Sequence, residues 1–513
     1  MDNGAPVLMI GLDAAELTLV ERLCDEGKLP TLAALRQDGC FGSLEAEATI
    51  FSGAVWPTLY SGTRAPWHGI YHDRLWRHER MRFEMAHDGW LSATPFWERL
   101  DRDCRVAIVD VPLVLRIPRA MNGVMISGWG SHDRVFTGIR PRALGGQLRR
   151  ECGPPVMSLP FVRPRTAAEF LALRDNMVAT TQQMARLCLR LLARGPWDLF
   201  CVVFGAPHRA GHHLWDLSQI EPSGTHAPGA EFTHALEDVY AACDRAVAEV
   251  VEGSPKAAQI LVFAVHGMGP NPGWNDRFEQ ILSAIHGVAP RSAPEADRGH
   301  TAQLLIRVVE KLFPELTRSA RNYRVNRRLT KRHDWSATRY FALPMDHAGY
   351  MRVNLAGREP CGIVQPGPEY RALCDELREA LLSVRDITTD EPIVERVYRV
   401  EDLAPAAAPH RDRLPDLVVT WGRQSAIRSR GIYRPGYGAI RWNDNGVLPS
   451  LRSGNHRGNG WFIALGPGIE AGSRVPGHHI SDVAPTVLRW LGTARENDGH
   501  GKPIPPLCRE ARA

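Results

Sequence analysis

The sequence predicts an α/β protein with a mostly parallel central sheet and helices on both faces. Short apolar, β-branched runs alternate with amphipathic stretches of helix length, which is the pattern of strand–helix–strand units. The composition, with 44% hydrophobic and 23% charged residues, is that of a folded globular chain and excludes a disordered or fibrous one. The length of 513 residues is sufficient for one large domain with insertions.

Six apolar runs are expected to be strands, and the residues that follow them are the first candidates for function. The runs cover residues 7–10, 106–111, 199–204, 260–265, 417–420 and 462–465. In a parallel sheet of this kind, functional groups gather beyond the carboxyl ends of the strands. Asp13, His208 and His266 follow strands in this way, and His456 lies one turn before the last run.

The order of these stretches divides the chain into three parts. We expect an alternating core from residues 1–270 and 420–500, an inserted helical cap at 271–335, and a smaller α+β lobe, continuous with the core, at 336–419. Within the cap, four arginines recur at helical spacing and share one face: Arg318, Arg321, Arg324 and Arg328. A solvated helix face is favoured over an anion-binding surface, because charge runs are usually solvated.

Net charge, the N-terminus and the cysteines indicate location and partners. The net charge of +5 is small for this length and does not imply a nucleic-acid partner. The N-terminus lacks the basic and apolar regions of a signal peptide, and no run approaches the roughly 18 apolar residues of a membrane span. The 10 cysteines form no C-x-x-C pair. We therefore expect a cytoplasmic protein with reduced, mostly buried thiols and no membrane anchor.

Asp13 and Ser52 each allow a structural and a functional interpretation. Asp13 ends the first strand, where its carboxylate could hold a metal, but together with Glu16 it could instead cap the following helix. Ser52 precedes two small residues and resembles a nucleophile at a helix start, where backbone N–H groups favour an anion. It could also be an ordinary N-cap. The competing hydroxyls nearby are those of Thr49, Thr58 and Ser61.

Four histidines favour a metal centre. His208 and His212 are four residues apart, so on a helix both imidazoles project from one face and can ligate one zinc ion, whereas His213 points elsewhere. Surface or packing histidines would show the same spacing. His266 and His456 each lie beside a buried run and next to glycine, where a loop turns sharply. Each histidine alone could be structural, but all of them at strand ends of one sheet favour a metal centre.

The order of these motifs resembles the alkaline phosphatase superfamily, most closely its type I phosphodiesterase/nucleotide pyrophosphatase branch. VLMIGLDAAE is similar to the family's first strand and metal-binding aspartate, and SGAVWPTLYSGTRAPWHGI to its nucleophile helix. The motifs that follow in family order are VVFGAPHRAGHHLW, VFAVHGMG, GYMRVNLAGREPCGIV and GNHRGNGWFIALGPGI. The resemblance runs from about residue 7 to about residue 492 and implies an alkaline phosphatase-like fold.

The resemblance implies a role for each candidate residue. Ser52 would be the nucleophile that takes the phosphoryl group. The metal that activates Ser52 would be held by Asp13, Ser52 and His266, and a second metal by His208, His212 and His456.

Two positions depart from the family pattern. Relatives usually have aspartate where this chain has His208, and aspartate directly before the histidine where this chain has Val265. The loss of two carboxylates is balanced if one divalent cation is omitted or if the substrate is more anionic. Three histidines with an open fourth position resemble a catalytic zinc site, so we expect a divalent metal, zinc, as one or two ions. In a one-metal site, His266 or Asp13 could act as general base toward Ser52.

The function expected from these residues is metal-dependent hydrolysis of a phosphate ester, of phosphodiester or nucleotide type, through a covalent intermediate on Ser52. The expected partner is a small phosphorylated substrate; nucleic acid is disfavoured, and the oligomeric state is not indicated. Two alternatives stay open: a transferase or other altered chemistry in specialised metabolism, and a catalytically inactive protein that binds a phosphoryl ligand. A sulfatase is disfavoured, because the residues after Ser52 do not form the C/S-x-P-x-R sequence.

Overall fold

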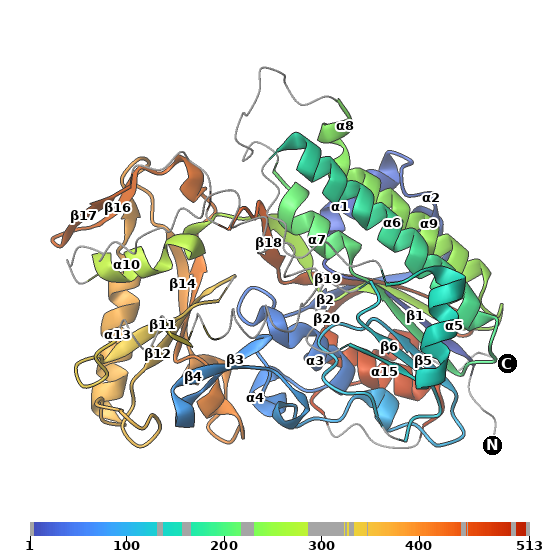
Figure 1. Cartoon of the computed structure of the whole chain (residues 1–513), viewed down its shortest axis with the longest axis horizontal. Coiled ribbons are helices and arrows are strands. Elements are labelled where there is room, and N and C mark those ends of the chain that lie inside the picture. Colours follow the sequence, from blue (N-terminus) through green and yellow to red (C-terminus); the bar gives the residue numbers. More distant parts are fainter. Residues whose placement is uncertain are drawn as a thin grey trace.

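The chain forms two bodies side by side, a larger one built on a nine-stranded sheet and a smaller one built on a four-stranded sheet (Figure 1). The computed structural model describes residues 5–118, 120–130, 137–155, 166–216, 230–285, 323, 326–327, 333–345, 347–442, 448, 450–493 and 499–508. The predicted α/β class with a mostly parallel central sheet is confirmed.

The direction of the strands decides where the ends of the large sheet lie. In spatial order its strands are β20 (Arg474–His479), β2 (Cys40–Glu45), β19 (Asn459–Leu465), β9 (Gln259–Ala264), β1 (Val7–Leu12), β8 (Leu199–Phe204), β5 (Val106–Val109), β6 (Gly123–Ser127) and β7 (Gly138–Arg140). Neighbours are parallel except where β19 meets β2 and β9 and where β6 meets β7. Because β19 runs against β9, it begins at the edge where β1, β8 and β9 end.

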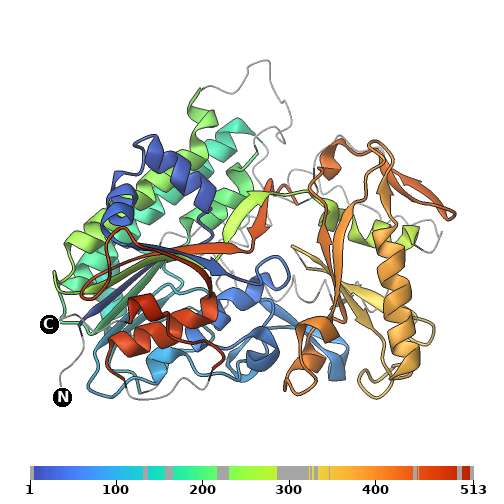
Figure 2. The ribbon, with the colours of Figure 1, turned by 180° about the vertical axis from the view of Figure 1, so that it is seen from behind.

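Helices cover both faces of this sheet (Figures 1 and 2). One face carries α1 (Leu17–Asp25), α2 (Pro30–Asp38), α5 (Arg142–Cys152), α6 (Ala167–Leu192), α7 (Ala206–Leu214) and α9 (Ala235–Glu252). The other face carries α3 (Val55–Ser61) and α15 (Val483–Trp490). Strand β1 shows why both faces need cover: Ile10 packs among the first set of helices and Met9 among the second, as the two-residue period of a strand requires.

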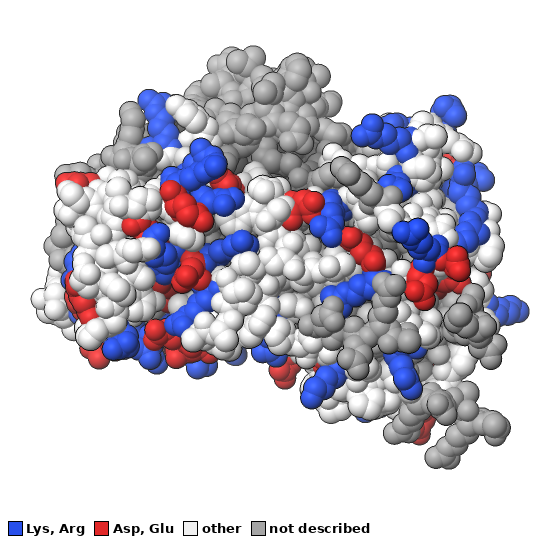
Figure 3. All heavy atoms as spheres, turned by 90° about the horizontal axis from the view of Figure 1, so that it is seen from below, with Lys and Arg blue, Asp and Glu red and all other residues white. Residues whose placement is uncertain are grey.

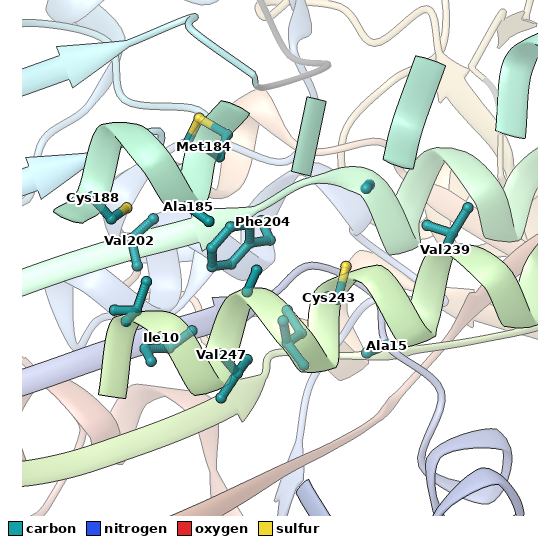
Figure 4. Packing of buried hydrophobic residues seen from close by; sticks show 14 of the residues in the cluster. Ile10, Ala15, Met184, Ala185, Cys188, Val202, Phe204, Val239, Cys243 and Val247 are labelled. Carbon is teal, nitrogen blue, oxygen red and sulfur yellow. The ribbon is translucent and has the colours of Figure 1, made fainter. Parts of the chain in front are cut away.

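The core under α6 and α9 is close-packed (Figure 4). Val202 of β8 and Ile10 of β1 lie side by side in the sheet, and Val247 of α9 and Ala185 of α6 belong to the same cluster. A rigid sheet of this kind holds the residues at its carboxyl edge in fixed positions.

The smaller body is a four-stranded antiparallel sheet flanked by helices. Its strands are, in spatial order, β11 (Tyr340–Leu343), β12 (Gly349–Val353), β15 (Leu417–Trp421) and β14 (Val394–Arg399), and α13 (Pro368–Leu382) packs on it. A three-stranded sheet of β13 (Arg385–Asp386), β16 (Gly431–Arg434) and β17 (Gly438–Arg441) contacts α10 (Phe278–Ala284). Two-stranded pairs complete the fold: β3 (Arg74–Arg77) with β4 (Arg82–Met85), and β10 (Gly267–Pro270) with β18 (Gly454–Arg457).

One predicted strand lies outside the central sheet. The run at 417–420 does form a strand, β15, but it pairs with β12 and β14 of the smaller body and is not part of the central sheet. An apolar run indicates a strand that is buried on both faces, but it does not show to which sheet the strand belongs. The division into core, cap and lobe stays a prediction. Most of the predicted cap, including its four arginines, lies outside the described residues.

The GYMRVNLAGREP segment forms a buried ion network in the smaller body. Arg358 donates from both Nη atoms to Asp416, at 2.8 and 2.7 Å, and Tyr370 donates to the same carboxylate at 2.8 Å. Arg352, fully buried, donates from Nε to Glu359 at 2.8 Å. Burial raises the pKa of Asp416, but the charge and hydrogen bonds of Arg358, the charge of Arg352 and the Val353 N–H together outweigh burial and hold this pKa below its usual range. The segment is therefore a structural device of the smaller body.

Three general expectations can be compared with the structure. Each of the ten cysteines is a free thiol, and most are buried. Among the described helices, none combines the length and apolarity needed to cross a bilayer. On the face seen in Figure 3, cationic and anionic side chains lie next to one another, in keeping with the small net charge of +5.

Candidate metal centre

Five of the six predicted site residues gather at the carboxyl edge of the central sheet. Asp13 follows β1, His266 follows β9, and His208 and His212 lie one turn apart on α7, which begins directly after β8. His456 lies on β18, just before β19. The sequence places His456 before its core strand and not after it. Because β19 runs antiparallel to β9, the residues that precede β19 lie at the same edge of the sheet as those that follow β9.

Three of these histidines point one ring nitrogen at a common centre. The Nε2 atom of His208 lies 3.0 Å from that of His212 and 2.9 Å from that of His456, and the last two are 3.2 Å apart. Ligands at about 2.0–2.1 Å from a tetrahedral zinc ion lie about 3.3 Å from one another, close to these distances. In the part of the chain that the structure describes, no other group of His, Cys, Asp or Glu is arranged to hold an ion.

Hydrogen bonds to Nδ1 of His208 and of His212 fix the tautomer of each ring, so that Nε2 presents a lone pair to the centre. His208 donates from Nδ1 to Asp13 Oδ2 at 2.7 Å, and His212 donates from Nδ1 to the carbonyl of Gly454 at 2.9 Å. Both acceptors lack a proton to give, so the neutral rings carry no hydrogen on Nε2. Two lone pairs 3.0 Å apart repel unless a cation or a proton lies between them. The donor set therefore fits a metal ion.

The surroundings keep the imidazoles of His212 and His456 neutral. Burial lowers the pKa of His212 well below its usual value, and the charge of Arg452 lowers it further. Burial also lowers the pKa of His456, assisted by the neighbouring imidazole of His347. Neutral imidazole is the form that binds metals, so the protein has removed the proton that would compete with an ion.

Asp13 acts on the centre through His208. Its Oδ1 accepts from Trp56 Nε1 at 3.0 Å while its Oδ2 accepts from His208, and the side chain is fully buried. A carboxylate that receives the second N–H of a metal-binding histidine fixes the ring orientation and increases its basicity. The alternative interpretation, a helix cap, is wrong, because Glu16 occupies the N-cap position of α1.

Close packing between β18 and α7 holds His212. A Cβ atom at Gly454 would lie 2.0 Å from the carbonyl oxygen of Gly211, so only glycine allows the two backbones to approach this closely. The Ser453 N–H also donates to the His212 carbonyl at 2.8 Å. His213 turns away from the centre and lies 3.3 Å from the carbonyl of Leu451 through Nδ1, as expected.

The ligand set predicted for a second metal, beside Ser52, is less complete than the three-histidine group. His266 donates from Nδ1 to the carbonyl of Gly267 at 3.0 Å, and its Nε2 lies 4.0 Å from Asp13 Oδ1. Val265, at the position where the resemblance leads us to expect an aspartate, is fully buried in the apolar cluster under α3. With both Asp13 oxygens engaged by Trp56 and His208, this side offers few free ligands.

Ser52 starts the short 3-10 turn (Ser52–Ala54) that leads into α3. One turn later, Trp56 bonds Asp13, which anchors the Ser52 segment to the metal side of the sheet. The N-cap positions of the turn and of α3 are Phe51 and Ala54, so Ser52 is not a cap. Among the described residues, no hydrogen bond joins Ser52 to the three-histidine group, so its role as nucleophile stays a prediction.

Two of the competing hydroxyls have structural partners. Thr58 Oγ1 lies 3.1 Å from His68 Nε2, and Ser61 donates to the Pro57 carbonyl at 2.6 Å. Both side chains are fully buried. These hydroxyls stabilise α3 and its continuation, which leaves Ser52 and Thr49 as the candidates of this segment.

Two further residues at the centre, His347 and Asn455, carry no recognisable pattern in the local sequence. His347, in the turn between β11 and β12, stacks on His456, and its Nδ1 donates to Asn455 Oδ1 at 2.9 Å. His347 is separated from Asn455 by 108 positions. A single histidine ahead of a strand has no distinguishing pattern, so only the packing of the two bodies reveals it.

Comparison with known proteins places these features in context. The sequence profile of the family described as Type I phosphodiesterase / nucleotide pyrophosphatase matches residues 7–436. No curated protein sequence matches significantly. Among solved structures, phosphonoacetate hydrolase from Sinorhizobium meliloti 1021, in complex with phosphonoformate, is 15% identical, with a TM-score of 0.50 and 96% of each chain covered. Human ectonucleotide pyrophosphatase / phosphodiesterase 5 is 14% identical, with a TM-score of 0.49, 96% of this chain and 97% of that chain covered.

Proposed function

Because the chain belongs to the type I phosphodiesterase/nucleotide pyrophosphatase family, whose members hydrolyse phosphate esters, we propose that it cleaves a small phosphodiester or nucleotide-type substrate at a single-metal centre. His208, His212 and His456 would hold one zinc ion. The observation that carries the proposal is the convergence of their three Nε2 atoms within 3.2 Å.

Charge supports one ion in place of two. His208 and Val265 stand at positions where the family resemblance implies aspartates, so relative to that pattern the site lacks two negative charges. Omission of one divalent cation restores the balance. Asp13 is then released from metal binding and serves as the residue that orients His208, which agrees with its two hydrogen bonds.

Ser52 is the proposed nucleophile. Its Oγ would form a bond to phosphorus while one ester bond, to the leaving alcohol, breaks. The phosphoryl group on Ser52 would keep its other ester substituent, and water would then cleave the Ser52–phosphorus ester bond to release a phosphate monoester. The proton of Ser52 would pass to His266, whose Nδ1 is bound to Gly267 and whose Nε2 is therefore free of hydrogen when neutral. A bound zinc ion would polarise a phosphoryl or leaving-group oxygen as a Lewis acid.

The test combines metal content with turnover. Purified protein should contain one zinc ion per chain and hydrolyse bis-p-nitrophenyl phosphate. Ser52→Ala should lose turnover and keep its zinc, whereas His208→Ala should lose both. Ser61→Ala is the matched control, because its hydroxyl bonds Pro57 within the same segment, and it should keep both.

A catalytically inactive phosphoryl-binding protein is the second candidate, favoured by the loss of a ligand at Val265. It predicts zinc binding and affinity for a phosphorylated ligand without turnover. Transfer of the phosphoryl group to an alcohol in place of water would indicate the transferase alternative, and it is detected by product analysis in the presence of a competing alcohol.

A further inference from the structure

The smaller body contributes a histidine to the metal centre. The His347 ring lies 4.2 Å from the His456 ring, centroid to centroid, with 20° between their planes. It also lies 5.3 Å from the His212 ring, at 17°. Two of the three proposed ligands therefore share one stacked neighbour, and that neighbour comes from the turn between β11 and β12 of the other body.

One amide fixes His347 in this place. Asn455 Oδ1 accepts from His347 Nδ1 at 2.9 Å and from the His456 backbone N–H at 2.8 Å, while its Nδ2 donates to the His347 carbonyl at 3.2 Å. The donors and acceptors around the amide agree with a single orientation of its oxygen and nitrogen. Asn455 is the residue next to a proposed ligand, so it joins the two bodies at the centre itself.

His456 lacks the orienting bond that the other two ligands have. His208 is held through Nδ1 by Asp13 and His212 by Gly454. The Nδ1 atom of His456 is buried and has no hydrogen-bond partner among the described residues. Its ring lies instead between two other rings, with His347 at 4.2 Å and His266 at 4.3 Å.

We propose that His347 and Asn455 form a bracket that positions His456 and His212 for metal binding, so that the smaller body sets the metal affinity of the centre. The inference rests on the proposed function, because it requires an ion at the three histidines. His347 is a positioning residue in this scheme, acting through the rings on which it stacks. A side chain that merely fills space at the junction would leave the affinity and coordination geometry of the ion unchanged.

The experiment measures zinc affinity by chelator competition, and coordination geometry from the visible absorption of bound Co²⁺. His347→Ala should bind zinc about 10- to 100-fold more weakly, the range found when a residue that supports a metal ligand is removed. Its Co²⁺ spectrum should shift. His347→Phe keeps a flat ring on His456 and should recover much of the affinity, while Asn455→Ala should weaken binding. His213→Ala, one residue from His212 and turned away, is the control and should match the wild type.

The outcomes separate the two claims. Wild-type affinity and an unchanged Co²⁺ spectrum in His347→Ala, beside a wild type that binds both ions, would refute the bracket and leave the metal centre intact. A wild type that binds neither ion would refute the centre and the bracket together. Should His347→Ala fail to fold, His347→Phe and Asn455→Ala carry the test, and wild-type behaviour of both would overturn the proposal.

Discussion

Replacing Asp13 with asparagine tests how the protein prepares His208. Asp13 accepts two hydrogen bonds, from Trp56 Nε1 and from His208 Nδ1. Asparagine has one acceptor oxygen and one donor amide, so it can satisfy only one of these partners. If the amide faces His208, that ring must accept through Nδ1 and carry its hydrogen on Nε2, where it blocks the metal. If the amide faces Trp56, two buried donors oppose each other.

The loss of zinc-binding free energy in Asp13→Asn is set by whichever of these two arrangements is less unfavourable. A buried donor left without an acceptor costs about 1–3 kcal/mol, and the binding of zinc must be weakened by that amount to keep His208 in the metal-binding tautomer. This corresponds to a loss of about 5- to 150-fold in zinc affinity. Chelator competition at fixed pH measures it, with circular dichroism to show that Asp13→Asn is folded.

Removing the competing donor should reverse part of the loss. Trp56→Phe alone leaves the carboxylate on His208 and should bind zinc within a few-fold of wild type. In the double variant Asp13→Asn/Trp56→Phe, the asparagine oxygen can turn to His208 without opposing the indole N–H. We expect the double variant to bind more tightly than Asp13→Asn, a non-additive result that contact residues can give. Equal zinc affinity in Asp13→Asn and wild type would show that Asp13 does not orient His208.

Three further predictions concern other parts of the molecule. Arg358→Met leaves the buried Asp416 without its ion-pair partner and should lower the free energy of unfolding, measured in urea, by about 3–5 kcal/mol. The control Arg399→Met removes a more exposed ion pair and should cost under about 1 kcal/mol. Similar losses in the two variants would show that burial does not decide the contribution of these ion pairs. Burial lowers the pKa of His68 from 6.5 to about 3, so the unfolded chain binds more protons between these values and stability falls as the pH drops. His68 should contribute about 2 kcal/mol to the stability lost between pH 7.5 and 5, and His68→Phe should reduce the loss measured in urea titrations by that amount. His266→Ala should keep one zinc per chain but lower kcat/KM by about 10²- to 10⁴-fold; loss of an ion would instead indicate a two-metal site.

The strands at the centre of the fold are predictable because burial on both faces makes them apolar throughout. Val7–Leu12 and Leu199–Phe204 are of this kind. The edge strand Arg474–His479 is not, because it contains proline and glycine and exposes several side chains. The strand Leu417–Trp421 is predictable from its apolar run, but the run does not identify its partner strand, because burial alone does not specify pairing.

The site shows the same division. The positions of the candidate residues at strand ends, and the four-residue spacing of His208 and His212, predict which residues come together at the site. They do so because parallel strands end at the same edge of the sheet. What Asp13 does there depends on Trp56 and His208, which lie 43 and 195 positions away in the chain. The contribution of His347 depends on how two bodies meet. Neither kind of contact leaves a pattern in the local sequence.

The way the three ligands are spread along the chain has a consequence for biosynthesis. His208 and His212 emerge from the ribosome more than two hundred residues before His456, which precedes the antiparallel strand β19. The nascent chain can thus fold much of the parallel sheet and still possess only two of the three proposed ligands, and two histidines hold zinc weakly. On the proposed one-metal centre, stable metal loading would wait until synthesis is nearly finished, so a stably bound ion would mark a chain whose final sheet strands have been made.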